Sequence, residues 1–386
     1  MVGPSGFTPT RRGVIRTGAG LAFGGALSGC VGNGESGTPT DSGPGTPTDS
    51  GTPGSYSVSM EPVGEVTFDA VPETWVANNG SWADMGIALG LEPPEAVWLT
   101  PRYHTQYYDT VDGVSVDKSG MTSLWQDGVS KELFYDLDAD VHVIDPNFLM
   151  NRFKGWEESD VEDIEERVAP LFGNCSYAQH YSWHADYRYY SLYEAFEKLA
   201  KVFRRTDRFQ AFEAVHEEFK SNVAPVAPTG GDRPEVAVLW GAGQNPNEPE
   251  SFYPYVIDDG FSFKHFNTLN VRDALADTDI KDFHASRAAI DLETLLDIDP
   301  PVMMLRGYEA KSESEFRDSV VSFLQNHDIA SQLTAVQNGD VHRGGGLYQG
   351  PITYMVLTER TAGQLYDFDG ELFDRGRVAD IVDGNL

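Results

Sequence analysis

The feature that most limits what this chain can fold into is one long amphipathic stretch between two regions where strands and helices alternate. Ser191 and Glu194 form a capping box, a usual helix start. Apolar residues then recur at helical spacing, at positions 192, 195, 196, 199, 202, 203, 209, 212, 215 and 219. Pro225 and Pro228 end the pattern. It predicts one helix over residues 191–225, about 48 Å long at the rise of an α-helix, and a rigid strut between two lobes. A long helix packed within one domain is the alternative.

Strand-like runs, loops and helical patterns alternate on both sides of that stretch. Before it lie strand-like runs at residues 65–71, 96–100 and 141–145 and helical patterns at 84–91 and 130–137. After it lie strands at 235–240 and 302–305 and a helix at 292–296. This order is typical of βα units in a mostly parallel sheet. We therefore expect an α/β fold of two lobes, residues 58–190 and 226–386, each with a central, mostly parallel sheet, joined by the long helix, with a ligand cleft between them.

The first 29 residues differ from the rest of the chain in charge. They carry three arginines at positions 11, 12 and 16 and no acidic residue, as a targeting segment would. The arginine run resembles a twin-arginine export signal, and the sequence LSGC at residues 27–30 resembles a lipobox. The apolar run between them, about ten residues, is too short to span a bilayer. We expect Cys30 to be lipidated and to anchor the protein on the outer face of the cytoplasmic membrane; a chance cysteine is the alternative.

The next segment, residues 30–57, has the composition of a flexible tether. It consists largely of Gly, Ser, Thr, Pro and Asp, and the hexad TPTDSG occurs twice, at residues 38–43 and 46–51. Such a sequence buries too little apolar area to fold. We expect it to hold a folded body, acting as a monomer, away from the membrane.

The charge balance excludes some functions. The chain has 60 acidic and 28 basic residues, a formal net charge of −32. A nucleic-acid binder needs clustered cations, so this class is excluded. An acidic surface of this kind is typical of proteins that stay soluble at very high salt, and we expect a halophilic source. The two cysteines, Cys30 and Cys175, make neither a disulfide framework nor a zinc motif.

Aromatic residues and arginines follow several predicted strands, at the edge where open α/β sheets bind ligands. The candidate ligand-binding residues are Trp75, Arg102, Tyr103, Trp125, Trp240, Tyr253, Arg306 and Tyr348. Aromatic faces together with arginines suit a large, flat or anionic chelate, which they hold by stacking and charge-assisted hydrogen bonds. For each aromatic residue, packing in the core or at the rim is the alternative.

The tract YAQHYSWHADYRYY at residues 177–190 contains His180 and His184, four residues apart. On a helix both would face one way and could bind a metal or haem iron. No third ligand is fixed by the spacing, so we favour an aromatic lid or lobe-packing segment, and we predict no metal site. Whether the two histidines contact a ligand is left open.

Motifs of common enzyme classes are incomplete. The sequence GAG at residues 241–243 lacks the third glycine of a dinucleotide fingerprint, and HEEFK at 216–220 lacks the second histidine of a zincin. Neither a GxSxG elbow nor a P-loop occurs. We therefore predict a non-enzymatic protein without a cofactor of its own. A surface-tethered hydrolase is the alternative from another class.

Four short segments carry a resemblance to a known family. They are VTFDAVP at residues 66–72, SKELFYDLDADV at 130–141, LETLLDIDP at 292–300 and VQNGDV at 336–341. With them, residues 62–370 resemble the solute-binding proteins that serve ABC importers for ferric siderophores, haem and cobalamin, the group with a single helical backbone between its lobes. The chain departs from the family pattern at Ala139, where a proline is usual, and at Pro301, where an aspartate is usual.

The resemblance implies a function and a partner. It implies an extracytoplasmic protein that captures a ferric siderophore-type chelate and delivers it to an ABC importer; cobalamin or haem is the alternative within the class. It also implies that Glu132 and Glu293, one on each lobe, dock against arginines of the importer's membrane subunits. Two separated carboxylates fix orientation better than one. Ordinary solvated helix acids are the alternative for these two residues. The sequence names neither the chelate nor the cognate permease.

Overall fold

The computed structural model describes residues 54–126, 128–152, 155–231 and 233–386. The predicted signal at residues 1–29, Cys30 and nearly all of the predicted tether lie outside the described residues. The predicted tether ends at residue 57, whereas strand β1 (Tyr56–Met60) already pairs antiparallel with β2 (Gly64–Phe68). The folded body therefore begins slightly earlier than predicted, because the alternating sequence YSVSM buries Val58 and Met60 on one face of this hairpin.

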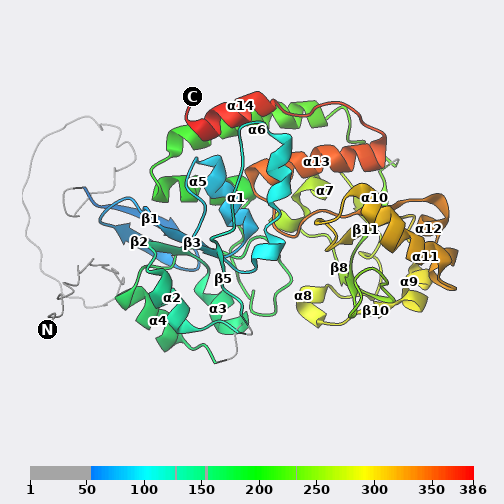
Figure 1. The fold of residues 1–386 in the computed structure, drawn as a ribbon, viewed down its shortest axis with the longest axis horizontal. Helices are drawn as coiled ribbons and strands as arrows, with labels where there is room; N and C mark the ends of the chain where they lie inside the picture. The colour runs from blue at the N-terminus through cyan, green and yellow to red at the C-terminus, as the bar shows by residue number, and fades with distance from the viewer. Residues whose placement is uncertain (1–53, 127, 153–154, 232) are drawn as a thin grey trace, which may run out of the picture.

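The chain forms two α/β lobes, each built on a sheet (Figure 1). The N-terminal sheet has the order β5-β4-β3-β6, all parallel, with strands β3 (Trp75–Ala77), β4 (Ala96–Val97), β5 (Thr122–Ser123) and β6 (Val141–Val143). The C-terminal sheet has the order β10-β8-β7-β11-β12, with β9 beside β7. Its strands are β7 (Glu235–Ala242), β8 (Ser251–Tyr255), β9 (Arg272–Asp273), β10 (Ile290–Asp291), β11 (Val302–Arg306) and β12 (Val341–Arg343). The predicted fold class, α/β with mostly parallel sheets, is confirmed.

The predicted first strand belongs to a different element. Residues 65–71 were expected to open a parallel βα unit, but they fall largely in β2, whose partner in the hairpin is β1. The first strand of the parallel sheet is β3, which begins at Trp75.

Helices surround both sheets. In the N-terminal half they are α1 (Gly80–Ala88), η1 (Thr100–Arg102), η2 (Thr105–Thr110), α2 (Lys131–Leu137), α3 (Pro146–Arg152), α4 (Glu158–Arg167), α5 (Leu192–Val202) and α6 (Thr206–Val223). In the C-terminal half they are η3 (Phe261–Phe263), α7 (Lys264–Thr268), α8 (Phe283–Ser286), α9 (Leu292–Ile298), α10 (Glu313–Phe316), η4 (Arg317–Val321), α11 (Ser322–Asn326), η5 (Ala330–Gln332), α12 (Thr334–Asn338), α13 (Pro351–Tyr366) and α14 (Arg375–Asp383). None of the described helices is long and apolar enough to cross a membrane.

The single helix predicted over residues 191–225 is two helices, α5 and α6. The turn between them contains Arg204 with a left-handed φ of 49°. The two helices then pack on each other, with the ring of Tyr193 stacked on His216 at 3.8 Å and Phe196 edge-on to Phe212. The apolar stripe predicted for one long face is therefore divided between two helices that bury it against one another.

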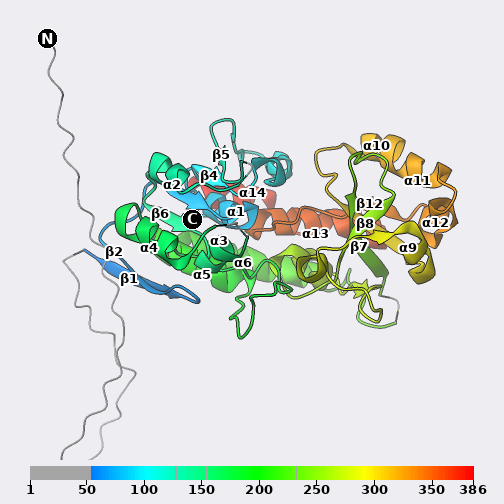
Figure 2. The same cartoon turned by 90° about the horizontal axis from the view of Figure 1, so that it is seen from below.

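More than one helix joins the lobes. Figure 2 shows α13 running from the N-terminal lobe into the C-terminal one, beside α6; it contacts α1 and α5 and also α7 of the C-terminal lobe. The last helix, α14, returns to pack against α1 and α6. This final part of the predicted C-terminal lobe, residues 226–386, thus lies against the N-terminal lobe.

Arg208 fixes the position of α14. Its guanidinium donates one hydrogen bond to the carbonyl of Leu89 (2.9 Å), at the end of α1, and another to that of Val382 (2.7 Å) in α14. Gly90, with a φ of 64°, lets the guanidinium approach, because a Cβ there would lie 1.3 Å from Arg208 Nη1.

Two buried carboxylates also tie the lobes together. Asp84 on α1 accepts hydrogen bonds from the Tyr108 hydroxyl (2.7 Å) and from the amides of Ile352 (2.9 Å) and Thr353 (3.2 Å), in the first turn of α13. A carboxylate is favoured at a helix N-terminus, where amides lack intrahelical partners. Asp84 therefore joins α13 to the N-terminal lobe.

The second carboxylate, Glu309, follows β11 in the C-terminal lobe. It is bound by Arg360 of α13 (2.7 Å), by the amide of Gly345 (3.1 Å) and by the hydroxyl of Tyr107 in the N-terminal lobe. The fold thus connects its lobes through polar groups that are buried and paired.

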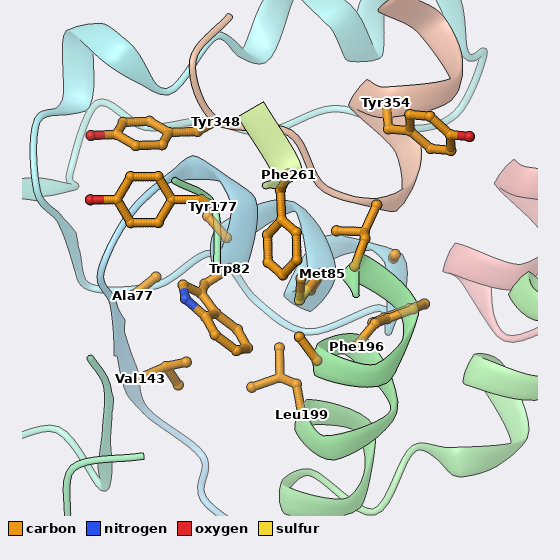
Figure 3. Packing of buried hydrophobic residues seen from close by; sticks show 14 of the residues in the cluster. Ala77, Trp82, Met85, Val143, Tyr177, Phe196, Leu199, Phe261, Tyr348 and Tyr354 are labelled. Carbon is orange, nitrogen blue, oxygen red and sulfur yellow. The ribbon is translucent and has the colours of Figure 1, made fainter. Parts of the chain in front are cut away.

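The apolar core is continuous across this junction. The larger cluster of buried residues includes Trp82 and Met85 on α1, Phe196 on α5 and Tyr354 on α13 (Figure 3). A smaller cluster fills the C-terminal lobe around β11. Because the larger core extends into α13, the lobes share buried contacts in addition to their connecting helices.

Candidate functional site

Arginines and aromatic rings from both lobes gather where the lobes face each other. We call this group the arginine–aromatic cluster; it consists of Arg102, Arg152, Tyr177, Tyr181, Trp240, Tyr255, Arg287, Arg306 and Tyr348. The N-terminal lobe contributes residues from η1, the end of α3 and the 177–190 tract. The C-terminal lobe contributes residues from β7, β8 and β11, the residue after α8 and the segment before α13.

Arg102 links the two lobes within this cluster. It ends η1 in the N-terminal lobe, and its guanidinium lies 5.0 Å from the ring of Trp240 on β7, a contact worth roughly 0.5–2 kcal/mol. Arg102 also hydrogen-bonds the hydroxyl of Tyr348; burial raises the pKa of Tyr348, and the charge of Arg102 opposes this rise. Arg102, Trp240 and Tyr348, three of the predicted residues, therefore lie together.

Arg306 is the most buried charge of the cluster. It ends β11 and has no exposed surface. Nη2 donates to the carbonyl of Ser262, whereas Nε and Nη1 have no partner among the described residues. The guanidinium also lies 5.3 Å from the Tyr255 ring, and burial lowers the pKa of Arg306 to about 10. A buried guanidinium with unused donors is costly, so this site is chemically incomplete without an acceptor.

Tyr177 and Tyr181 form the aromatic part of the cluster. Their hydroxyls are 2.6 Å apart, and the ring of Tyr177 meets that of Tyr348 edge-on at 5.5 Å. Figure 3 shows the hydroxyl ends of Tyr177 and Tyr348 pointing the same way, away from Trp82 and Met85. The two hydroxyls thus face away from the apolar core.

The 177–190 tract also joins the lobes through its backbone. The amide of Ser262 donates to the carbonyl of Tyr177 (3.1 Å), and the amide of Gln179 donates to Asp258 (2.8 Å). These contacts support the interpretation of the tract as a lobe-packing segment.

Two more arginines flank Tyr181. Arg287, in a left-handed conformation after α8, has its guanidinium 5.7 Å from the Tyr181 ring. Burial lowers the pKa of Arg287, and the positive charge of Arg152 lowers it further. Arg152, at the end of α3, has a buried Nε without a partner among the described residues. The cluster therefore holds four guanidiniums.

The four other predicted ligand-binding residues lie elsewhere, and two of them are buried. Trp75 is buried in the N-terminal core, edge-on to Phe203, with its indole N–H on the carbonyl of Glu92 (3.0 Å). Tyr103 is buried too, with its hydroxyl 2.9 Å from that of Tyr108. Neither faces the other lobe's arginines, because each side chain fills the interior of its own lobe.

The remaining two are at the surface or in part exposed. Trp125 is 40 % exposed and lies against the ring of Trp98. Tyr253 on β8 is half-buried and packs on Phe283 at 4.4 Å. Tyr253 lies one side chain away from Arg287, which also contacts Phe283.

Sequence reasoning did not select Tyr177, Tyr181 and Tyr255 as ligand-binding residues, nor Arg152 and Arg287. A signal for the arginines existed. Among arginines that the structure describes, Arg102, Arg152 and Arg287 alone have no acidic residue within three positions. In so acidic a chain, such local isolation marks guanidiniums that no neighbouring carboxylate neutralises.

His180 and His184 make other contacts. The tract is irregular, not helical; His180 Nε2 lies 3.6 Å from Asp258, and His184 stacks on Tyr187 at 4.1 Å. Burial lowers the pKa of His184 to about 4. Within the described ranges no three His, Cys, Asp or Glu side chains converge as a metal site would require.

Glu132 and Glu293 occupy matching elements of the two lobes. Each is exposed in the first turn of a short helix, α2 or α9, that ends in a left-handed aspartate, Asp138 or Asp299, before a central strand. Both helices lie on the side of the molecule away from α6 and α14 (Figure 1). The structure therefore presents one acidic helix start on each lobe.

Comparisons with known proteins agree with this architecture. The periplasmic binding protein family model matches residues 161–346. No curated protein sequence matches the chain significantly. A periplasmic binding protein from Veillonella parvula matches at a TM-score of 0.56 and 13% identity, over 82% of this chain and 99% of that one.

Two solved siderophore-binding proteins are also similar. One is BauB, in complex with two acinetobactin molecules and ferric iron, at a TM-score of 0.54 and 17% identity, over 82% of this chain and all of that one. The other is the petrobactin-binding protein YclQ of Bacillus subtilis, at 0.52 and 13%, over 81% and 98%. At these identities the likeness establishes the fold, and the family match supports a solute-binding role.

Proposed function

We propose that this chain, which has the fold of the periplasmic binding proteins, is an extracytoplasmic protein that binds an iron chelate of siderophore type and delivers it to an ABC importer. The observation that carries the proposal is the arginine–aromatic cluster. It combines π-faces from both lobes with guanidinium donors that lack partners, the two kinds of group that hold a large chelate. Its position between the lobes is where such proteins bind their solute.

The similar proteins support the ligand class. BauB and the petrobactin-binding protein are named for siderophores. Cobalamin and haem are alternatives of the same class. A tethered hydrolase has less support, because the matched family consists of binding proteins.

The importer and the membrane anchor belong to the same proposal. Glu132 and Glu293 are exposed on corresponding helices of the two lobes, as docking carboxylates must be. Replacing both with Gln should abolish import while the affinity for the chelate stays unchanged. Cys30 and the preceding twin-arginine segment supply the lipid anchor and the export route, which place the body outside the cytoplasmic membrane.

The direct test is calorimetric titration of the full chain in high salt. The probes are a ferric hydroxamate, a ferric catecholate, cobalamin, haemin and uncomplexed ferric iron. We expect saturable binding of one iron chelate at micromolar concentration or below. Arg102→Gln should weaken it at least tenfold, whereas Arg317→Gln, a surface residue paired with Glu313, should not. Absence of binding to all five probes would contradict the proposal.

A further inference from the structure

The arginine–aromatic cluster has an unusual charge for this chain. The whole protein carries a formal −32, yet Arg102, Arg152, Arg287 and Arg306 gather between the lobes. None of the four forms an ion pair with a carboxylate in the part of the chain that the structure describes.

The four guanidiniums act on shared neighbours. The charges of Arg306 and Arg102 both counter the rise that burial causes in the pKa of Tyr255. Those of Arg102 and Arg152 do the same for Tyr348. Besides burial, the charge of Arg152 lowers the pKa of Arg287, so the four charges form one positive region and not isolated surface groups.

Arg360, with a side chain 22 % exposed, shows how this fold neutralises an arginine near the lobe junction, and only its Nε has no partner among the described residues. Its guanidinium binds both carboxylate oxygens of Glu309, at 2.7 and 3.3 Å. Arg306 is buried as fully as Glu309 but ends on a single carbonyl oxygen. Both arginines lie near the lobe junction. Arg306 therefore differs from Arg360 because it lacks a carboxylate acceptor, and not because of its place in the fold.

The nearby carboxylates do not balance the cluster. Asp258, Asp282 and Glu309 act electrostatically on Arg306, but all three are held by other donors, Glu309 by Arg360. Asp258 accepts from the amides of Gln179 and Gly260, and Asp282 accepts from the amide of Val256 and from His284. With Arg360 counted beside Glu309, five guanidiniums against three carboxylates leave a surplus of two positive charges.

We infer that the solute carries at least two negative charges, so that the site selects an anionic chelate over a neutral one. This inference deepens the proposed function and rests on it. Anionic oxygens would accept from the free donors of Arg152 and Arg306, and the rings of Trp240 and Tyr181 would cover the faces of the chelate. Charge-assisted bonds of this kind are the strong ones in a partly dry site.

Two iron complexes of similar size separate charge from shape. Ferric iron with three catecholate groups, each 2−, has a net charge of 3−. Ferric iron with three hydroxamate groups, each 1−, is neutral. Both are flat-sided, octahedral iron–oxygen complexes, so a preference between them reports mainly on charge.

The test is calorimetry on the full chain with both complexes at the same pH and salt. We expect the tris-catecholate complex to bind at least tenfold more tightly than the tris-hydroxamate complex. Arg152→Gln and Arg287→Gln should each reduce the affinity for the anionic complex at least threefold, and should reduce that for the neutral complex by a clearly smaller factor. Arg317→Gln should change neither. Circular dichroism checks that each variant is folded.

The outcomes separate the two proposals. Equal or tighter binding of the neutral complex overturns the charge inference and leaves the solute-binding function intact. Equal losses for both complexes in the arginine variants also overturn it, because they would mean a structural role for the arginines. Absence of binding to either complex, and to cobalamin and haemin, overturns the proposed function and this inference with it.

Discussion

The lobes of this protein meet in two regions that treat buried charge in opposite ways. At Asp84 and Glu309, every carboxylate oxygen accepts a hydrogen bond, and each carboxylate has at least one donor from α13. In the arginine–aromatic cluster, Arg306 and Arg152 keep buried donor atoms that find no partner among the residues the structure describes. The first region neutralises its charges without a ligand and holds the lobes together. The arginines of the second region find acceptors for these donors only when an anionic ligand binds. The presence or absence of a partner within the protein therefore distinguishes the structural contacts from the binding site.

Breaking the paired region should have the largest effect on stability. Glu309→Gln removes the charge that faces Arg360 and leaves that partly buried guanidinium without a counterion, at a cost approaching the roughly 3–5 kcal/mol in the free energy of unfolding that breaking a fully buried pair costs. Denaturant unfolding followed by circular dichroism measures it. The matched control is Glu313→Gln, which removes the exposed ion pairs to Arg317 and Arg343 and should cost at most about 1 kcal/mol. An equal loss of unfolding free energy in both variants would contradict the structural role assigned to Glu309.

The two carboxylates of the paired region should give opposite pH dependences. Burial raises the pKa of Asp84 to about 6. The folded state then keeps a proton that the unfolded chain releases, so the contribution of Asp84 to stability falls as pH rises from about 4 to 6. Although burial opposes it, Arg360 holds the pKa of Glu309 down at about 2, so stability from Glu309 is lost as pH falls from about 4 towards 2.

The measurement is the free energy of unfolding from pH 2 to 8 for the wild type and Asp84→Asn. In the wild type, Asp84 should lower the free energy of unfolding by an amount on the order of 2 kcal/mol between pH 4 and 6. We expect this fall to be absent from the variant. Asp258, whose pKa burial also raises to about 6, supplies a decrease that remains in the variant. An unchanged pH profile would show that Asp84 is not buried as a carboxylate.

Removing an unpaired charge should have the smallest effect on the unliganded protein. Arg306→Met deletes a buried guanidinium whose main bond is to one carbonyl, and the free energy of unfolding should change by no more than about 1 kcal/mol. The same variant should lose the stabilisation that a saturating chelate gives the wild type, about 2.7 kcal/mol at a hundred times the dissociation constant. A large loss of stability without ligand would mean that Arg306 belongs to the paired, structural class.

The sequence predicted the α/β class and the central strands well, because strands such as residues 235–240 and 302–305 are buried apolar runs with clear ends. It failed at the long helix. The apolar positions step by six from 203 to 209, and at this gap the chain turns at Arg204. The apolar spacing is helical both before and after this gap. The six-residue step from 203 to 209 was therefore the one sequence signal for the end of α5.

The candidate site was predicted in part for a similar reason. Trp75 was placed in a loop after a strand at residues 65–71, but it begins β3 and is therefore buried. Arg102 and Tyr103 are neighbours in sequence, yet one contacts the opposite lobe and the other fills its own. Which of two adjacent side chains faces a cleft depends on loop conformation, which residue type does not encode.

The return of α14 to the N-terminal lobe has a consequence for biosynthesis. Val378 and Ile381 complete a core whose other members include residues near the start of the body, such as Met60 and Trp82. The first lobe to be synthesised therefore cannot close its core until α14 has emerged from the ribosome. Contacts of such wide sequence separation slow folding, so the N-terminal lobe completes its fold only after the C-terminal lobe has been synthesised, with both lobes maturing together and not one after the other.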